Sequence, residues 1–207
     1  MKLLSFLRIS IIVSSFLCYL NATAKEPIKI IPSFNYYYDL SDSYGKGSLF
    51  SGSLGLSQSF YGLNMDFGYF QGHSVFIYNI VIEDLEKTIE IKFDEVSNMK
   101  TSSVSLVFIP IKKDWITADL NCGIALNKAI LSQFNKVDYS YSLIENKFIY
   151  LYKDYKLVRR THIGYQVGFD ISLYFLPKIG FQISSRIQDL NNGGTFFFVG
   201  GGLCFRL

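Results

Sequence analysis

The chain has 207 residues, which suffices for one domain with a sizeable hydrophobic core, and its formal net charge at pH 7 is only +3. Such a weak charge argues against a nucleic-acid-binding protein, which would carry a strongly basic patch. A hydrophobic share of 49% excludes a disordered chain, and 16 Gly, 15 Tyr and 19 Phe against 4 Pro favour strands and tight turns.

Residues 1–24 have the organisation of a secretory signal peptide. Lys2 and Arg8 form a positive region, an apolar stretch follows, and Ala22-Thr23-Ala24 provides a cleavage site of small residues. We therefore expect cleavage after this triplet, which leaves 25–207 as the mature domain. The alternative is an uncleaved N-terminal anchor.

The rest of the chain alternates apolar and polar residues with a period of two, which is the pattern of β-strands. In the clearest case, Ile163, Tyr165 and Val167 alternate with Gly164 and Gln166. No apolar face of these strands carries a charged residue, although 18% of the chain is charged. Eight such stretches follow one another, at 29–40, 50–57, 61–70, 104–110, 116–127, 162–172, 178–187 and 196–207.

Two architectures fit alternating strands. A secreted lipocalin-like barrel is apolar inside and polar outside, whereas an outer-membrane barrel has the reverse arrangement. The polar faces here are rich in Gly and Ser, which suits a narrow, filled lumen better than a water-exposed wall. The sequence therefore predicts an all-β fold, an eight-stranded antiparallel up-and-down transmembrane β-barrel in the bacterial outer membrane.

The same polar faces carry four positive and four negative side chains, and a buried charge requires a partner. The depth of each charge along its strand favours an ion pair between Asp170 and Lys178, with Arg206 as an additional candidate partner. It also places Arg186 near Asp39. The filled lumen also predicts that there is no open pore. The complete predicted lumen charge network is Lys29, Asp39, Asp66, Asp119, Asp170, Lys178, Arg186 and Arg206.

Connection lengths support this topology, because outer-membrane barrels have short periplasmic turns and longer outside loops. The connections at 58–60 and 112–114 are tight, whereas 71–102 and 128–161 are long. The first long connection contains a hairpin-like segment at 74–93. This segment either extends strands three and four outward or adds two strands to make a ten-stranded barrel.

Aromatic side chains are expected at both membrane interfaces. Trp115 follows a tight turn, so it indicates the periplasmic girdle together with Tyr61 and Phe205. The outer girdle is predicted to contain Tyr36, Tyr38, Phe50 and Tyr69.

The two long connections have opposite charge. The connection at 73–100 is rich in acidic residues, and the one at 128–160 is rich in basic residues and Tyr. Either the second is a ligand or partner surface, or the two dock on each other by charge. The candidate binding residues are Tyr139, Tyr141, Lys153, Lys156, Arg159 and Arg160.

Catalysis and metal binding have little support. His73 beside Ser74 raises the hypothesis of a lipid-modifying enzyme, but neither an orienting carboxylate nor a positioned nucleophile is indicated for it or for His162. Cys122 is predicted to point outward and Cys204 inward, so they should not form a disulfide. We predict no catalytic, metal or cofactor site.

Three C-terminal segments carry a resemblance to a known family. The segments 103–126, 178–192 and 194–207 are similar to the central hairpin, penultimate strand and closing strand of small outer-membrane barrels of Bacteroidetes, the group of PorT-like barrels. The chain ends in Leu207 instead of the usual aromatic residue, two positions after Phe205. The resemblance implies the barrel fold and, because the family is functionally mixed, no particular activity.

Three functional hypotheses follow. The first is a non-enzymatic envelope component that has a structural or binding role through its extracellular loops. The second is a lipid-modifying barrel enzyme, and the third is a secreted binder of an apolar ligand. For the first, the expected partners are outer-membrane lipid and the barrel assembly machinery, with another envelope protein as a further candidate, and neither nucleic acid nor a cofactor is expected.

Overall fold

The computed structural model describes residues 27–41, 43–82 and 85–207. The predicted signal peptide, 1–24, lies outside these residues. No helix in the described part of the chain is long and apolar enough to cross a membrane.

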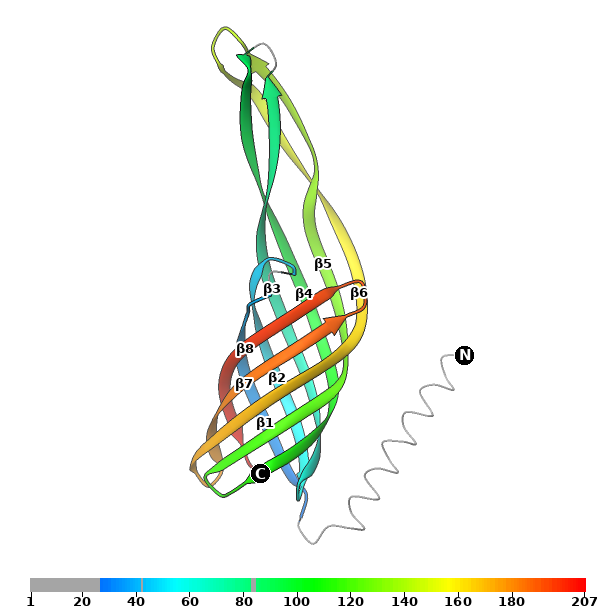
Figure 1. Ribbon diagram of the computed structural model, residues 1–207, viewed down its shortest axis with the longest axis vertical. Coiled ribbons are helices and arrows are strands. Elements are labelled where there is room, and N and C mark those ends of the chain that lie inside the picture. The colour runs from blue at the N-terminus through cyan, green and yellow to red at the C-terminus, as the bar shows by residue number, and fades with distance from the viewer. Residues whose placement is uncertain (1–26, 42, 83–84) are drawn as a thin grey trace, which may run out of the picture.

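The described residues form a closed, antiparallel barrel of eight strands in which each strand pairs with its neighbours in sequence (Figure 1). The barrel closes where β1 pairs with β8, from Ser33 opposite Cys204 to Asp39 opposite Phe198. This confirms the predicted eight-stranded all-β fold, and the ten-stranded alternative is wrong. The strands are β1 (Lys29–Asp39), β2 (Lys46–Gln58), β3 (Tyr61–Ile82), β4 (Lys87–Lys112), β5 (Ile116–Ser142), β6 (Lys147–Leu176), β7 (Ile179–Leu190) and β8 (Gly194–Phe205).

Glycine makes this closing seam possible. A Cβ atom built on Gly200 would lie 1.9 Å from the Tyr36 carbonyl oxygen, and one on Gly202 would lie 1.8 Å from the Phe34 oxygen. Any side chain at either position would therefore force β8 away from β1. The glycines of the closing strand therefore serve this close backbone approach.

The wall and the lumen have opposite character. Phe67 is 64% exposed and Ile124 67% exposed on the outer wall, whereas Asp39, Gln166 and Arg186 are buried inside. An apolar wall around a polar interior is the arrangement of a membrane barrel and the reverse of a lipocalin-like one. The predicted outward faces are therefore correct, and the secreted soluble barrel is not the fold observed.

Aromatic rings fill one end of the lumen. Phe196 and Phe198 stack with ring centroids 5.5 Å apart, and Phe70 meets Phe196 edge-on at 5.6 Å. Gly47 lies against this cluster, since a Cβ there would come within 2.5 Å of the Phe70 ring. These rings and the buried Tyr37 leave this part of the barrel closed by side chains.

Strands β3, β4, β5 and β6 continue far beyond the barrel (Figure 1). β4, β5 and β6 contain 26, 27 and 30 residues, whereas β1, β7 and β8 contain 11 or 12. Pairing between β4 and β5 ends at Val96 opposite Ser132, and beyond it the β3–β4 and β5–β6 hairpins continue separately. We call residues 74–95 and 133–156 together the mast.

The mast corrects the prediction of two long loops. The connections at 71–102 and 128–161 are almost entirely strand: β3 continues to Ile82 and β4 begins at Lys87, and a short turn at 143–146 joins β5 to β6. For the first, extension of strands three and four was one of the two alternatives. The second was predicted as a long outside connection, and the structure shows a β-hairpin whose charged side chains Lys136, Asp138 and Lys147 are exposed.

Candidate functional site

An ion pair lies at the centre of the lumen. The Arg186 guanidinium on β7 contacts the Asp66 carboxylate on β3 at 3.1 Å, and their side chains are 4% and 3% exposed. Arg186 also donates to the Tyr37 hydroxyl on β1 at 3.3 Å. The pairing of Arg186 with Asp39 predicted from depth is therefore wrong.

Asp39 instead lies at the rim of the barrel, where it holds backbone in place. Its carboxylate accepts hydrogen bonds from the Ser41 amide at 3.0 Å and from the Phe197 amide at 3.3 Å. These bonds tie the end of β1 to the start of β8. The carboxylate is thus committed to local structure and not to Arg186.

Asp170 is buried among neutral donors. It accepts from the Asn121 amide at 2.9 Å and from the Ser184 hydroxyl. Lys178, its predicted partner, is exposed in the two-residue turn between β6 and β7. The prediction failed because β7 begins only at Ile179, which leaves Lys178 in the turn and exposed to solvent.

Of the other predicted lumen charges, Lys29 and Arg206 lie towards the periphery, whereas Asp119 lines the same cavity as Asp170. Lys29, Asp119 and Arg206 are half-buried. The Arg206 guanidinium stacks 3.7 Å from the Tyr174 ring and donates to the Asp114 carbonyl at 3.3 Å. Of the eight predicted charges, Asp66, Asp170 and Arg186 are therefore buried in the lumen, Asp119 lines the lumen cavity beside Asp170, and Asp39 lies at the rim.

The histidines do not form a catalytic arrangement. His162 is buried at the mouth of the lumen and hydrogen-bonds the Tyr44 hydroxyl at 2.9 Å and the Asn191 carbonyl at 3.2 Å. His73 is exposed and lies 3.4 Å from Asp94, but its neighbour Ser74 points to the opposite face of the strand.

Metal ligands are similarly dispersed. In the described ranges, no three His, Cys, Asp or Glu side chains gather where they could hold a metal ion. Cys122 is exposed on the wall, Cys204 is buried, and both are free thiols.

Aromatic residues line the outer wall at both ends of the barrel. Tyr36, Phe50 and Tyr69 are direct cross-strand neighbours, and the rings of Tyr36 and Phe50 lie 4.9 Å apart. The hydroxyl groups of Tyr36 and Tyr69 meet Ser48 and Asn98. Tyr38 is exposed in the same region, and Tyr61 and Trp115 are exposed at the end with short turns, whereas Phe205 is half-buried.

The mast has a hydrophobic core of its own. Ile80, Ile91 and Phe93 of the β3–β4 hairpin are buried against the β5–β6 hairpin. Phe134 joins the two, since its ring stacks on Phe76 at 5.0 Å and meets Phe93 edge-on at 4.6 Å. The period-two apolar residues at 80–82 and 89–93 were the sequence signal for this core.

The hairpins therefore dock through apolar packing and not through opposite charge. The ion pairs described within the mast, Lys136 with Asp138 and Lys147 with Glu145, each lie in one hairpin. The contacts that cross between the hairpins include a hydrogen bond from the backbone amide of Phe134 to the Glu95 carboxylate. The hydrogen bond from Lys136 to Asp138 raises the pKa of the exposed lysine.

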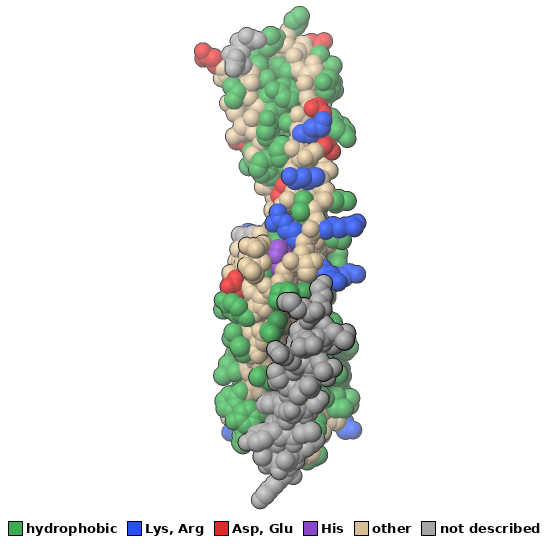
Figure 2. All heavy atoms as spheres, turned by 90° about the vertical axis from the view of Figure 1, so that its right-hand side faces the viewer, with side chains coloured by type: hydrophobic (Ala, Val, Ile, Leu, Met, Phe, Trp, Pro, Cys, Tyr) green, Lys and Arg blue, Asp and Glu red, His purple; other side chains and the backbone are tan. Residues whose placement is uncertain are grey.

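The outer surface of the mast exposes many apolar side chains. Ile144 at the tip is 98% exposed, Ile149 67% and Val81 61%, and Tyr150 and Tyr152 lie exposed between them. Figure 2 shows apolar side chains spread over this part of the molecule.

The predicted binding residues of the second long connection lie on strands and fall into two groups. On the mast, Tyr139 is exposed, Tyr141 packs against its core, and Lys153 donates to the Lys92 carbonyl at 2.6 Å. Lys156, Arg159 and Arg160 are exposed at its base. The predicted set is therefore not one continuous loop surface.

Comparison with known proteins identifies the fold but no family. No family model and no curated protein match this chain. Neisserial surface protein A is 12% identical, covering 88% of this chain and 100% of that one, with a TM-score of 0.56. The N-terminal β-barrel domain of OprF from Pseudomonas aeruginosa is 14% identical over 87% and 97%, with a TM-score of 0.52.

A major outer membrane protein from Thermus thermophilus gives a TM-score of 0.53 at 10% identity, covering 88% of this chain and 100% of that one. The chain has the fold of a small outer-membrane β-barrel. At these identities the likeness shows the fold alone. The apolar wall around a polar lumen agrees with it, because only such a wall suits lipid.

Proposed function

We propose that this chain is a non-enzymatic component of the bacterial outer membrane that binds another envelope or surface protein through the mast. The observation that carries the proposal is a projecting structure with a core of its own and an exposed apolar surface. A strand needs about 9–11 residues to cross a bilayer. The 30 residues of β6 are far more than anchoring requires.

The positions of the short turns and of the mast at opposite ends of the barrel support an extracellular mast. Outer-membrane barrels keep short turns on the periplasmic side and long excursions outside. Here the two-residue connections at 59–60 and 177–178 lie at one end, and the mast projects from the other (Figure 1). The C-terminus lies at the end with short turns, as expected for a periplasmic terminus.

The surface of the mast suits a protein partner. Large exposed apolar patches on a water-facing structure mark interaction sites, and Tyr is enriched in protein interfaces. Ile144, Ile149, Tyr150 and Tyr152 offer such a surface, and the internal packing at Phe134 holds it in place. A rigid surface loses little conformational entropy on binding.

The proposal includes the biogenesis that the sequence indicates: removal of 1–24 and insertion by the barrel assembly machinery. Aromatic girdles at the two membrane interfaces would position the wall. We also place the chain among the PorT-like barrels of Bacteroidetes, on the resemblance of its C-terminal strands, as a membrane component of a larger envelope assembly.

The test replaces the mast and leaves the barrel. Residues 76–93 and 134–155 are each exchanged for an Asn-Gly turn between cross-strand neighbours, Val75 with Asp94 and Gln133 with Lys156. We expect the shortened protein to insert and to show the gel shift of a folded barrel. Photocrosslinkers at Ile144 and Tyr150 of the full chain should capture one surface protein.

A crosslinker at Leu54, which points outward from the barrel wall, serves as the control. Capture of the same protein from Leu54, or no capture from either mast position in intact cells, would contradict the proposal.

A further inference from the structure

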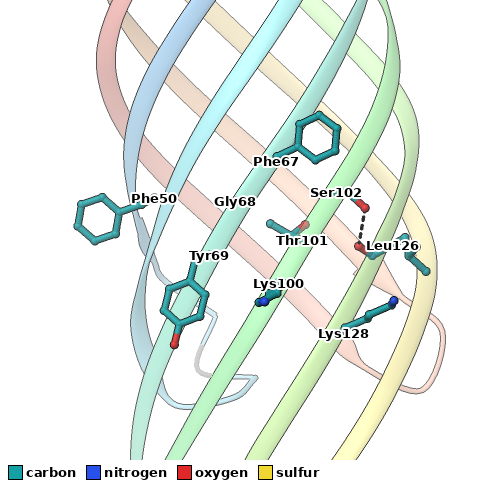
Figure 3. A pocket seen from close by; sticks show the side chains of 9 residues that line it. All are labelled: Phe50, Phe67, Gly68, Tyr69, Lys100, Thr101, Ser102, Leu126 and Lys128. Carbon is teal, nitrogen blue, oxygen red and sulfur yellow. Dashed lines mark hydrogen bonds between the residues drawn. The ribbon is translucent and has the colours of Figure 1, made fainter.

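A groove of about 630 Å³ runs along the outer wall of the barrel, on strands β2 to β5. Figure 3 shows its lining: Phe50, Phe67 and Tyr69 lie on one side, Leu126 on the other, and Lys100 and Lys128 near one end. An apolar groove with two ammonium groups at its end is amphipathic. It therefore fits a molecule with an apolar part and an anionic part.

The two lysines are direct cross-strand neighbours on the outer face. Lys100 on β4 lies opposite Lys128 on β5, and both side chains are exposed. Arg159 on β6 lies diagonally from Lys128, because Lys128 pairs with Thr161. Like charges in direct opposition destabilise a sheet unless an anion is present between them.

Within the described part of the chain, no carboxylate is paired with these cations. The direct and diagonal cross-strand neighbours of Lys100, Lys128 and Arg159 in the described sheet include no Asp or Glu. None of the ion pairs found among the described residues involves any of the three. Figure 2 shows basic side chains gathered where the barrel meets the mast.

The depth of these cations corresponds to the level of lipid headgroups. Lys128 lies twelve residues beyond Ile116, where β5 begins, and Lys100 lies twelve residues before Lys112, where β4 ends. At about 3.3 Å per residue and a tilt of about 40°, twelve residues rise about 30 Å, the thickness of a hydrocarbon core.

The aromatic row lies deeper in the wall than the two lysines, because Tyr69 is only eight residues beyond Tyr61, where β3 begins. Tyr36, Phe50 and Tyr69 are followed across the strands by Lys100 and then Lys128. Girdle aromatics mark the boundary between hydrocarbon and headgroup. The row of aromatics therefore changes into a row of cations on the side of the barrel that carries β4 to β6.

We propose that this groove is a binding site for an outer-leaflet lipid with a phosphorylated headgroup. The phosphates lie between Lys100, Lys128 and Arg159, and an acyl chain lies along Phe67 and Leu126. Phosphate suits these partners because ammonium groups attract it as point charges and a guanidinium can bind it in a bidentate manner. The site lies on the wall and does not depend on what the mast binds.

The test uses the mature protein in detergent micelles and a bisphosphorylated lipid A as probe, with its enzymatically dephosphorylated form as the comparison. Native mass spectrometry measures the bound fraction. We expect the bisphosphorylated lipid to bind and the Lys100→Gln/Lys128→Gln variant to lose about 30-fold in affinity, given the usual contribution of each lysine at a membrane surface.

Two variants make the result decisive. Lys113→Gln/Lys178→Gln removes the same charge from exposed lysines at the opposite end of the barrel and should bind as the unmodified protein does. Lys100→Arg/Lys128→Arg keeps the charge and should retain binding. Equal binding of both lipids, or equal losses in the two glutamine variants, would overturn the proposal.

Discussion

Arg186 brings a positive charge into the lumen, where a carboxylate and a hydroxyl group pair with it. Its partner Asp66 comes from the opposite part of the sheet, and the bond from Arg186 to Tyr37 fixes the guanidinium further. A sequence can show that Arg186 points inward, because alternation reveals its face. It cannot show that Asp66 is the partner, because contacts across a lumen depend on how the strands are staggered.

Removing this partner should be costly. Asp66→Ala leaves the guanidinium buried without its ion pair, and we expect about 3–5 kcal/mol lower stability. Asp138→Ala breaks an exposed ion pair with Lys136, and we expect this variant to lose only about 0–1 kcal/mol of stability. Urea unfolding of both variants in micelles measures the difference. Equal midpoints would mean that water solvates the lumen and that the pair is not buried.

Strands were predictable as elements, and their ends were not. Alternation located all eight, but the sequence analysis took the extensions of β5 and β6, which carry charges on one face, as a long connection. In the mast the other face packs against a second hairpin, as Phe134 does on Phe76 and Phe93. That packing partner is distant in sequence, so no local pattern could reveal it.

Phe134 should hold the hairpins together. Phe134→Ala removes a ring that touches both, and we expect trypsin to cleave the β5–β6 hairpin faster while the barrel stays folded. Ile149→Ala removes an exposed side chain and should leave the cleavage rate unchanged. Unaltered cleavage of the Phe134 variant would show that the hairpins do not pack on each other.

The closing strand should be essential for assembly. Deleting 203–207 removes β8 positions that pair with Ser33 and Phe34 of β1 and with Phe181 of β7. An open edge is not tolerated in lipid, so we expect the truncated chain to be degraded before insertion. Outer-membrane fractionation measures this, and a normal amount of inserted protein would be incompatible with the seam between β1 and β8.

The molecule as a whole is a filled barrel that carries a projecting mast. The rings of Phe70, Phe196 and Phe198 close one end of the lumen, and the Arg186 network occupies the middle. We therefore expect the purified protein to give no large, stable conductance in planar bilayers. Sustained open-channel currents from the folded protein would contradict a filled lumen.

The orientation of the mast is the central claim, and cysteine labelling tests it most directly. In a Cys122→Ser/Cys204→Ser background, single cysteines replace Ile144 at the mast tip and Asp114 in the turn between β4 and β5. In intact cells, a membrane-impermeant maleimide should label position 144 at once and position 114 only after the outer membrane is permeabilised. Labelling of position 114 in intact cells, with position 144 protected, would contradict the account.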